Sequence, residues 1–218
     1  MMTFAVLFDM DGVIVDSNPY HKLAFQAFLK QYNISLTDDE LKIHVYGRTN
    51  QEGMPFIFQR ELSSEELLER ANEKEAMFRD IYQTDIAPVN GLIPFLQRLR
   101  THHIPTAVGT AAPTANLNFI LDALDIRPYF DALLDSSYVT RGKPDPEIYL
   151  KAAAKLGVEP ANCIVIEDSL AGVLAGLNAG MKVIGITTTH TAEELSNTHL
   201  IITDFMGLTL EKLEALFK

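Results

Sequence analysis

The first hydrophobic run of the chain, residues 5–8, ends abruptly at Asp9, Asp11 and Gly12. Four consecutive apolar residues are typical of a short strand that is buried on both faces of a sheet. Two carboxylates at the end of such a strand indicate a site, because open parallel sheets bind ligands beyond the carboxyl ends of their strands. Asp-x-Asp-Gly also occurs by chance and at the start of many calcium loops, so the motif alone leaves a polar turn as an alternative.

Residues 19 to about 83 show helical spacing and no strand pattern. In the segment 19–32 apolar residues recur at i, i+3, i+4, i+7 and i+8, and Pro19 occupies a first-turn position. Three more helix starts carry a capping box, in which a hydroxyl and a glutamate three residues later satisfy free backbone N–H groups. These pairs are Thr37 with Glu40, Thr49 with Glu52, and Ser63 with Glu66.

Beyond residue 90 helical and strand patterns alternate. Helices are predicted over 90–101, 113–124, 145–156, 169–179 and from about 208, and strands over 104–109, 132–134, 163–167, 182–186 and 200–202. Such alternation is typical of a parallel sheet with helices on both faces. The sequence therefore predicts an α/β protein with a doubly wound, Rossmann-like core (residues 1–17 and 86–218) and an inserted all-helical cap domain (residues 18–85).

Composition narrows the classes of function. The formal net charge of −11 over 218 residues argues against binding to nucleic acid or to anionic membranes, since both require a basic surface. The single cysteine, Cys163, excludes a disulfide framework and a paired-cysteine zinc site. No apolar run approaches the ~20 residues that span a bilayer, and the N-terminus has no secretory signal pattern. We expect a cytoplasmic monomer.

Three further strand ends carry polar residues. Thr110 and Ala111 lie at a helix N-terminus, which is suited to anions, although Thr110 also fits an ordinary cap. Lys143 is flanked by prolines, yet a lone lysine is usually a solvated surface residue. Glu167 and Asp168 form a second acidic pair after a buried strand, and their mutual repulsion requires a cation nearby.

The order Asp-x-Asp-Gly, Thr, Gly-Lys-Pro-Asp-Pro and Glu-Asp-Ser along the whole chain resembles the haloacid dehalogenase-like superfamily. Within it the chain is similar to the β-phosphoglucomutase-like branch, which has a helical cap inserted after the first strand. The resemblance implies that Asp9 is the nucleophile and Asp11 the general acid and base. It implies a Mg²⁺ site made by Asp9, the backbone carbonyl of Asp11, Asp168, and Glu167 directly or through water. Phosphoryl oxygens would be held by Thr110, Ala111 and Lys143, and Lys143 would also pair with Asp9.

Three cap residues complete the predicted site. Lys74 shares a helical stripe with apolar residues, so its ammonium is expected on the buried face, unpaired until a substrate anion binds, rather than in solvent like an ordinary surface lysine. His21 and Arg48 flank helix starts, and the resemblance implies that both face the substrate. A solvated first-turn position remains the alternative for His21.

These residues predict a phosphoric monoester hydrolase that acts on a small phosphorylated metabolite, such as a sugar phosphate. A phosphoglucomutase shares the same catalytic loops, and an inorganic pyrophosphatase could use the same cap cations. A response-regulator receiver also uses aspartates, a threonine and a lysine, but is about half this length and places its phosphoacceptor after a later strand. A haloacid dehalogenase generally lacks an acid at the position of Asp11.

Overall fold

The computed structural model describes residues 4–46 and 49–218. The chain divides into two compact units, one made of Met1–Asp16 with Ile86–Lys218 and the other of Ser17–Asp85. The first unit contains the sheet and the second contains only helices in its described part.

The sheet of the first unit is parallel throughout its described strands. These are β1 (Ala5–Phe8), β2 (Thr106–Gly109), β3 (Ala132–Leu134), β4 (Cys163–Glu167), β5 (Lys182–Ile186) and β6 (Leu200–Ile202). Their order is β3-β2-β1-β4-β5-β6, so the chain moves outward from β1 in one direction and later in the other. The order therefore reverses beside β1, and ligands of doubly wound sheets bind at such a switch point.

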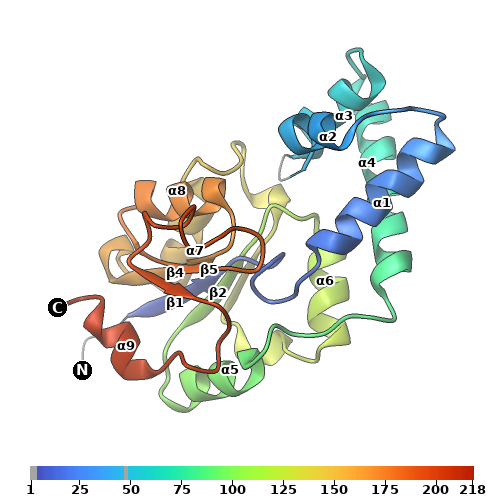
Figure 1. Ribbon diagram of the computed structural model, residues 1–218. Coiled ribbons are helices and arrows are strands. Elements are labelled where there is room, and N and C mark those ends of the chain that lie inside the picture. The colour runs from blue at the N-terminus through green and yellow to red at the C-terminus, as the bar shows by residue number, and fades with distance from the viewer. Residues whose placement is uncertain (1–3, 47–48) are drawn as a thin grey trace. The chain divides into compact units, whose positions relative to one another are not determined.

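Helices cover both faces of this sheet. They are α5 (Leu92–Thr101), α6 (Thr114–Ala123), α7 (Glu147–Leu156), α8 (Leu170–Asn178) and α9 (Leu210–Ala215). In Figure 1, α7 and α8 lie on one face of the strands, and α5 and α9 lie on the other. The α7–α8 face packs aliphatic side chains such as Leu7, Val165 and Val183, while the opposite face carries an aromatic group that includes Phe8, Phe95 and Phe205. The predicted doubly wound fold is confirmed.

The second unit contains α1 (Asn18–Gln31), α2 (Asp38–His44), α3 (Asn50–Phe58) and α4 (Ser64–Tyr82). Its core includes a cluster of apolar residues from α1, α2 and α3, with Phe28, Met54 and Ile57 almost fully buried, and α4 adds the buried Phe78 and Tyr82. Glu40 and Glu52 accept hydrogen bonds from the backbone N–H groups of Thr37 and Thr49, as the capping-box pattern predicts.

The third predicted capping box is only half formed. The Ser63 hydroxyl caps α4 by accepting from the Glu66 backbone N–H at 3.2 Å. The Glu66 carboxylate, however, forms a two-pronged ion pair with the Arg60 guanidinium at 3.0 and 2.5 Å. A charged partner competes better for a carboxylate than a neutral backbone N–H does, so this part of the prediction was wrong.

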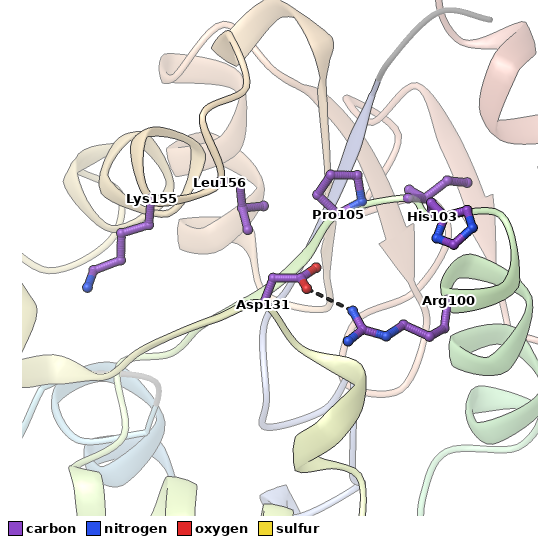
Figure 2. Close-up of a pocket in the computed structure, with 7 residues that line it drawn as sticks. Arg100, His103, Pro105, Asp131, Lys155 and Leu156 are labelled. Carbon is purple, nitrogen blue, oxygen red and sulfur yellow. Dashed lines mark hydrogen bonds and ion pairs between the residues drawn. The ribbon is translucent and has the colours of Figure 1, made fainter.

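A cavity of about 360 Å³ lies at the N-terminal edge of the sheet, where β2 and β3 begin (Figure 2). Within it Asp131 pairs with the Arg100 guanidinium at 2.8 Å and accepts from the Thr106 backbone N–H at 3.0 Å. The Asp131 carboxylate thus ties α5 to the starts of two strands. The strand-end residues singled out from the sequence lie on the opposite side, at the C-terminal ends of the strands. Among the described helices, none combines the length and the hydropathy needed to cross a bilayer.

Candidate active site

Strand register brings the two acidic motifs together. Phe8 of β1 is paired with Ile166 of β4, and the Asp9 backbone N–H donates to the Ile166 carbonyl at 3.1 Å. The next residues on both strands are therefore neighbours, and carboxylate oxygens of Asp9, Glu167 and Asp168 lie within 4.8 Å of one another. All three side chains are buried, with Glu167 wholly inaccessible. Such a cluster is the donor set that a hard divalent cation prefers.

Lys143 provides the positive charge in this cluster. Its Nζ lies 2.7 Å from Asp9 Oδ1 and 2.6 Å from Glu167 Oε1. The loop before α7 supplies this lysine, and the Glu147 carboxylate holds the loop by accepting from the backbone N–H groups of Thr140 and Arg141 at 2.9 and 3.1 Å. The Lys143 side chain therefore points into the protein and is not the solvated surface lysine that its sequence context left as an alternative.

Electrostatics show that one lysine does not balance the carboxylates. Burial raises the pKa of Asp9 well above its usual value; Lys143 opposes this shift, and Glu167 and Asp168 add to it. Burial, together with the charge of Glu167, raises the pKa of Asp168 to about 7. Burial lowers the pKa of Lys143, but Asp9 and Glu167 outweigh it, so the pKa of the lysine is raised overall. Both aspartates thus favour added positive charge, which a divalent cation would supply.

Glu167 is surrounded by hydrogen-bond donors. Its Oε1 accepts from Lys143 Nζ and from the Tyr149 hydroxyl, both at 2.6 Å. Its Oε2 accepts from the Asp168 and Ser169 backbone N–H groups at 3.1 and 3.2 Å and from the Ser169 hydroxyl at 3.1 Å. Five donors therefore fix the orientation of this carboxylate inside the protein.

Glycines make room for the two acidic side chains after β4. A Cβ on Gly12, whose φ is +79°, would lie 1.9 Å from Asp168 Oδ2. A Cβ on Gly172, in the first turn of α8, would lie 1.8 Å from Glu167 Oε1. Since no real Cβ approaches so closely, both positions require glycine for the acidic residues to keep these positions.

The remaining core residues of the predicted site follow β1 and β2. Val108 of β2 pairs with Phe8, so Gly109 lies beside Asp9 and Thr110 comes next. Thr110 is buried; its N–H donates to the Leu134 carbonyl, and its Oγ1 accepts from the Ala112 N–H, each at 3.0 Å. Ala111 is exposed directly after it, and Asp11 is half-buried in the loop after β1. Both loops thus begin at the C-terminal ends of the strands, where the carboxylates also lie.

In the helical unit, Lys74 lies on the buried face of α4, as the periodicity predicts, and is only 3% exposed. Its charge is not unpaired, and that expectation was wrong. Lys74 Nζ lies 2.6 Å from Glu75 Oε1, 4.4 Å from the centre of the Phe25 ring and 3.4 Å from His21 Nδ1. The His21 ring stacks on Phe78 with centroids 3.8 Å apart. Arg48, the third predicted cap residue, lies outside the described residues.

Sequence reasoning missed three partners of the site residues. Tyr149 looked like an ordinary apolar position of α7, and Glu75 like a solvated helix residue, so neither carried a signal. Thr189, whose hydroxyl donates to Asp168 Oδ2, follows β5. Inspecting the residues after each predicted strand, as was fruitful for β1, β2 and β4, would also have pointed to Thr189.

Known proteins resemble this chain over most of its length. The family model for haloacid dehalogenase-like hydrolases matches residues 5–180. A β-phosphoglucomutase of Bacillus subtilis (strain 168) is 32% identical over 218 residues, which cover 96% of this chain and 93% of that protein. A phosphorylated carbohydrates phosphatase of Thermotoga maritima is 33% identical over 182 residues, 82% of each protein.

A solved structure shows the same fold. The haloacid dehalogenase hydrolase of family IA, variant 3, from Entamoeba histolytica superposes with a TM-score of 0.91 at 32% identity and covers 99% of both chains. This chain is an enzyme of the haloacid dehalogenase-like hydrolase family, and it belongs to the β-phosphoglucomutase-like branch.

Proposed function

We propose that the enzyme is a Mg²⁺-dependent phosphatase that hydrolyses small phosphorylated metabolites, sugar phosphates in particular, through an aspartyl-phosphate intermediate. One observation carries the proposal: Asp9 lies in a buried carboxylate cluster and is bound by Lys143 at 2.7 Å. A carboxylate held between a lysine and a divalent cation is suited to attack a phosphoryl group whose own charge would otherwise repel it. The similarity to the phosphorylated carbohydrates phosphatase of Thermotoga maritima supports sugar phosphates as the class of substrate.

Each residue then has a distinct task. Asp9 attacks phosphorus, and Asp11 gives its proton to the leaving oxygen, so the alcohol departs neutral. Asp11 next removes a proton from water, which attacks the aspartyl phosphate, releases inorganic phosphate and restores Asp9. Lys143, Thr110 and the Ala111 N–H bind and orient phosphoryl oxygens.

The donor set fits Mg²⁺, because it consists of carboxylates and a carbonyl and leaves room for phosphate and water. Asp9, Asp168 and the Asp11 backbone carbonyl would hold the ion, with Glu167 in contact directly or through water. The bound ion supplies positive charge that offsets the phosphoryl oxygens. Asp9 and Asp168, whose pKa values are raised by burial, are the groups that such charge would keep ionised.

A phosphoglucomutase is the second candidate, favoured by the similarity to the Bacillus subtilis protein. A mutase must also bind the distal phosphate of a bisphosphate, and Lys74 is the described cap cation predicted for this task. Its ammonium is already paired with Glu75 at 2.6 Å, so it offers less uncompensated charge to a second phosphate. This pairing supports transfer to water over transfer to a second hydroxyl.

A phosphate-release screen tests the proposal. Sugar phosphates, phosphoglycolate, nucleotides and pyrophosphate are incubated with enzyme in Mg²⁺ and in EDTA, beside an isomerisation assay on β-glucose 1-phosphate. We expect Mg²⁺-dependent release from sugar phosphates and no isomerisation. Isomerisation faster than release would establish the mutase, and release from pyrophosphate alone would replace the sugar phosphates as substrates. Asp9→Asn is the control for contaminating phosphatases.

A further inference from the structure

The Tyr149 hydroxyl is the one part of this buried side chain that packing does not explain. The Tyr149 ring belongs to the aliphatic core between α7 and the sheet, and the side chain is 0% exposed. A phenylalanine would fill the same volume. The hydroxyl instead donates to Glu167 Oε1 at 2.6 Å, the same oxygen that binds Lys143 Nζ at 2.6 Å.

The Tyr149 ring also touches the other loops of the site. Its centre lies 5.0 Å from Lys143 Nζ, so the ammonium rests over the aromatic face. On the β2 side it packs against Gly109, where an added Cβ would lie 3.2 Å from the ring. Tyr149 therefore contacts the residue before Thr110, the lysine of the next loop and the glutamate after β4.

The five donors around Glu167 leave it no free direction. An ionised carboxylate offers about four lone-pair sites, and Lys143, Tyr149, Asp168 and Ser169 occupy them. With its lone pairs taken, Glu167 serves as a fixed anchor for Lys143. Lys143 has three N–H donors, of which one points to Glu167 and one to Asp9. The third is then aimed by these two contacts.

We propose that Tyr149 is a positioning residue for phosphoryl transfer: its hydroxyl locks Glu167 as the anchor of Lys143 and keeps this carboxylate from binding the metal directly. The inference rests on the proposed function. Without the hydroxyl, Glu167 Oε1 regains a lone pair, the carboxylate can turn, and Lys143 loses its fixed direction toward Asp9 and the phosphoryl group.

Tyr149→Phe tests this role, with Tyr138→Phe as the matched control because Tyr138 is 40% exposed in the same unit. We expect kcat to fall about 10–100-fold in Tyr149→Phe, the usual effect of removing an outer-shell hydrogen-bond partner, with KM changed less. Binding of inorganic phosphate in the presence of Mg²⁺, measured by calorimetry, should weaken. Affinity for Mg²⁺ alone should not fall, since Asp9 and Asp168 remain and Glu167 Oε1 is freed. Tyr138→Phe should match wild type in each measurement.

A double-mutant cycle with Glu167→Gln asks whether Tyr149 acts through the glutamate. We expect Tyr149→Phe to add no further loss in the Glu167→Gln background, because the hydroxyl acts on Lys143 through the Glu167 carboxylate, which is then absent, and phenylalanine keeps the ring over the ammonium. Full additivity overturns the proposal. So does a Tyr149→Phe enzyme with wild-type kcat and phosphate affinity, or one whose main defect is in Mg²⁺ affinity. A wild-type enzyme that releases phosphate from no ester would refute the proposed function instead, and calorimetry separates the two failures.

Discussion

Asp9 and Asp11 lie two residues apart, yet their surroundings differ. Asp9 is buried and its Oδ1 binds Lys143, whereas Asp11 is half-buried in the loop after β1. A nucleophile needs a fixed position, while a residue that exchanges protons with water needs access to it. The environments thus match the roles proposed for the two aspartates.

The two aspartates should respond differently to the same substitution. Asp9→Asn should abolish turnover and prevent capture of a phosphoenzyme, because an amide cannot form the acyl phosphate. Asp11→Asn should slow turnover by ~10²–10⁴-fold, the usual contribution of a general acid and base, and leave Mg²⁺ affinity nearly unchanged because the proposed ligand is a carbonyl. Rapid-quench trapping and metal titration measure both effects. Equal loss of Mg²⁺ affinity in the two variants would contradict this division.

The buried ion pair of Lys74 with Glu75 leads to a prediction about stability. Lys74→Met should destabilise the protein, by about 3 kcal/mol, since removing one partner of a buried ion pair leaves the other charge uncompensated. The expected loss lies at the low end of the known range because the Asn50 amide still donates to Glu75 at 3.1 Å. Urea unfolding measures the free energy.

The double variant Lys74→Met with Glu75→Gln is the matched control. It should recover most of the lost stability, because the glutamine carries no charge and keeps the hydrogen-bonding contact with Asn50. If Lys74→Met alone is as stable as wild type, the pair contributes little to folding. Lys74 would then be free to serve the substrate alone.

At the scale of elements, the loop that carries Lys143 depends on the first residue of α7. The Glu147 carboxylate accepts from the Thr140 and Arg141 backbone N–H groups and from Lys151 Nζ, the last at 2.6 Å. Lys151 and these N–H groups lower the pKa of Glu147 to about 2. The loop that carries Lys143 is thus anchored by α7, the helix that also supplies Tyr149.

Glu147→Gln should therefore reduce both stability and kcat at neutral pH. Because the folded-state pKa lies below the ordinary value of 4.5, the contribution of Glu147 to stability is fully present above about pH 4.5 and is lost as the pH falls toward about 2. The difference in unfolding free energy between wild type and Glu147→Gln should shrink over that range. Lys151→Met is the control, since it keeps the backbone hydrogen bonds and should leave kcat unchanged. A pH-independent difference would contradict the assignment.

For the whole molecule, the unbalanced carboxylates should make folding depend on metal. The proposed Mg²⁺ site exists in the folded enzyme and not in the unfolded chain, so at 100 times its Kd the ion should stabilise the fold by about 2.7 kcal/mol and raise the Tm. Asp168→Asn should lose most of this rise, because it removes a proposed ligand. Calorimetry with and without EDTA measures it. The same Tm in both conditions would disprove metal binding at this cluster.

The pattern of the sequence was enough to predict the fold class and which strand ends lie together. Helix and strand periods are local properties, so alternation after residue 90 and helical spacing before it were enough for the architecture. Parallel strands then bring their carboxyl ends to one edge, which is why the sequence alone places Asp9 and Asp168 together although they lie far apart in the chain. Hydroxyl–glutamate spacing likewise located three helix starts.

The partner of each charged group depends on how distant segments pack in the folded protein. Lys143 binds Asp9 across 134 residues of sequence; no local pattern reports such a pair, which only the family resemblance implied. Tyr149 lies on an apolar face of α7, yet its hydroxyl donates to Glu167. Glu66 has the spacing of a capping box, yet its carboxylate binds Arg60 instead of the backbone. A hydrogen bond or ion pair forms only when two segments that are distant in the sequence are placed to within a few tenths of an ångström. Periodicity sets which face of an element a side chain occupies, and packing sets what it meets there.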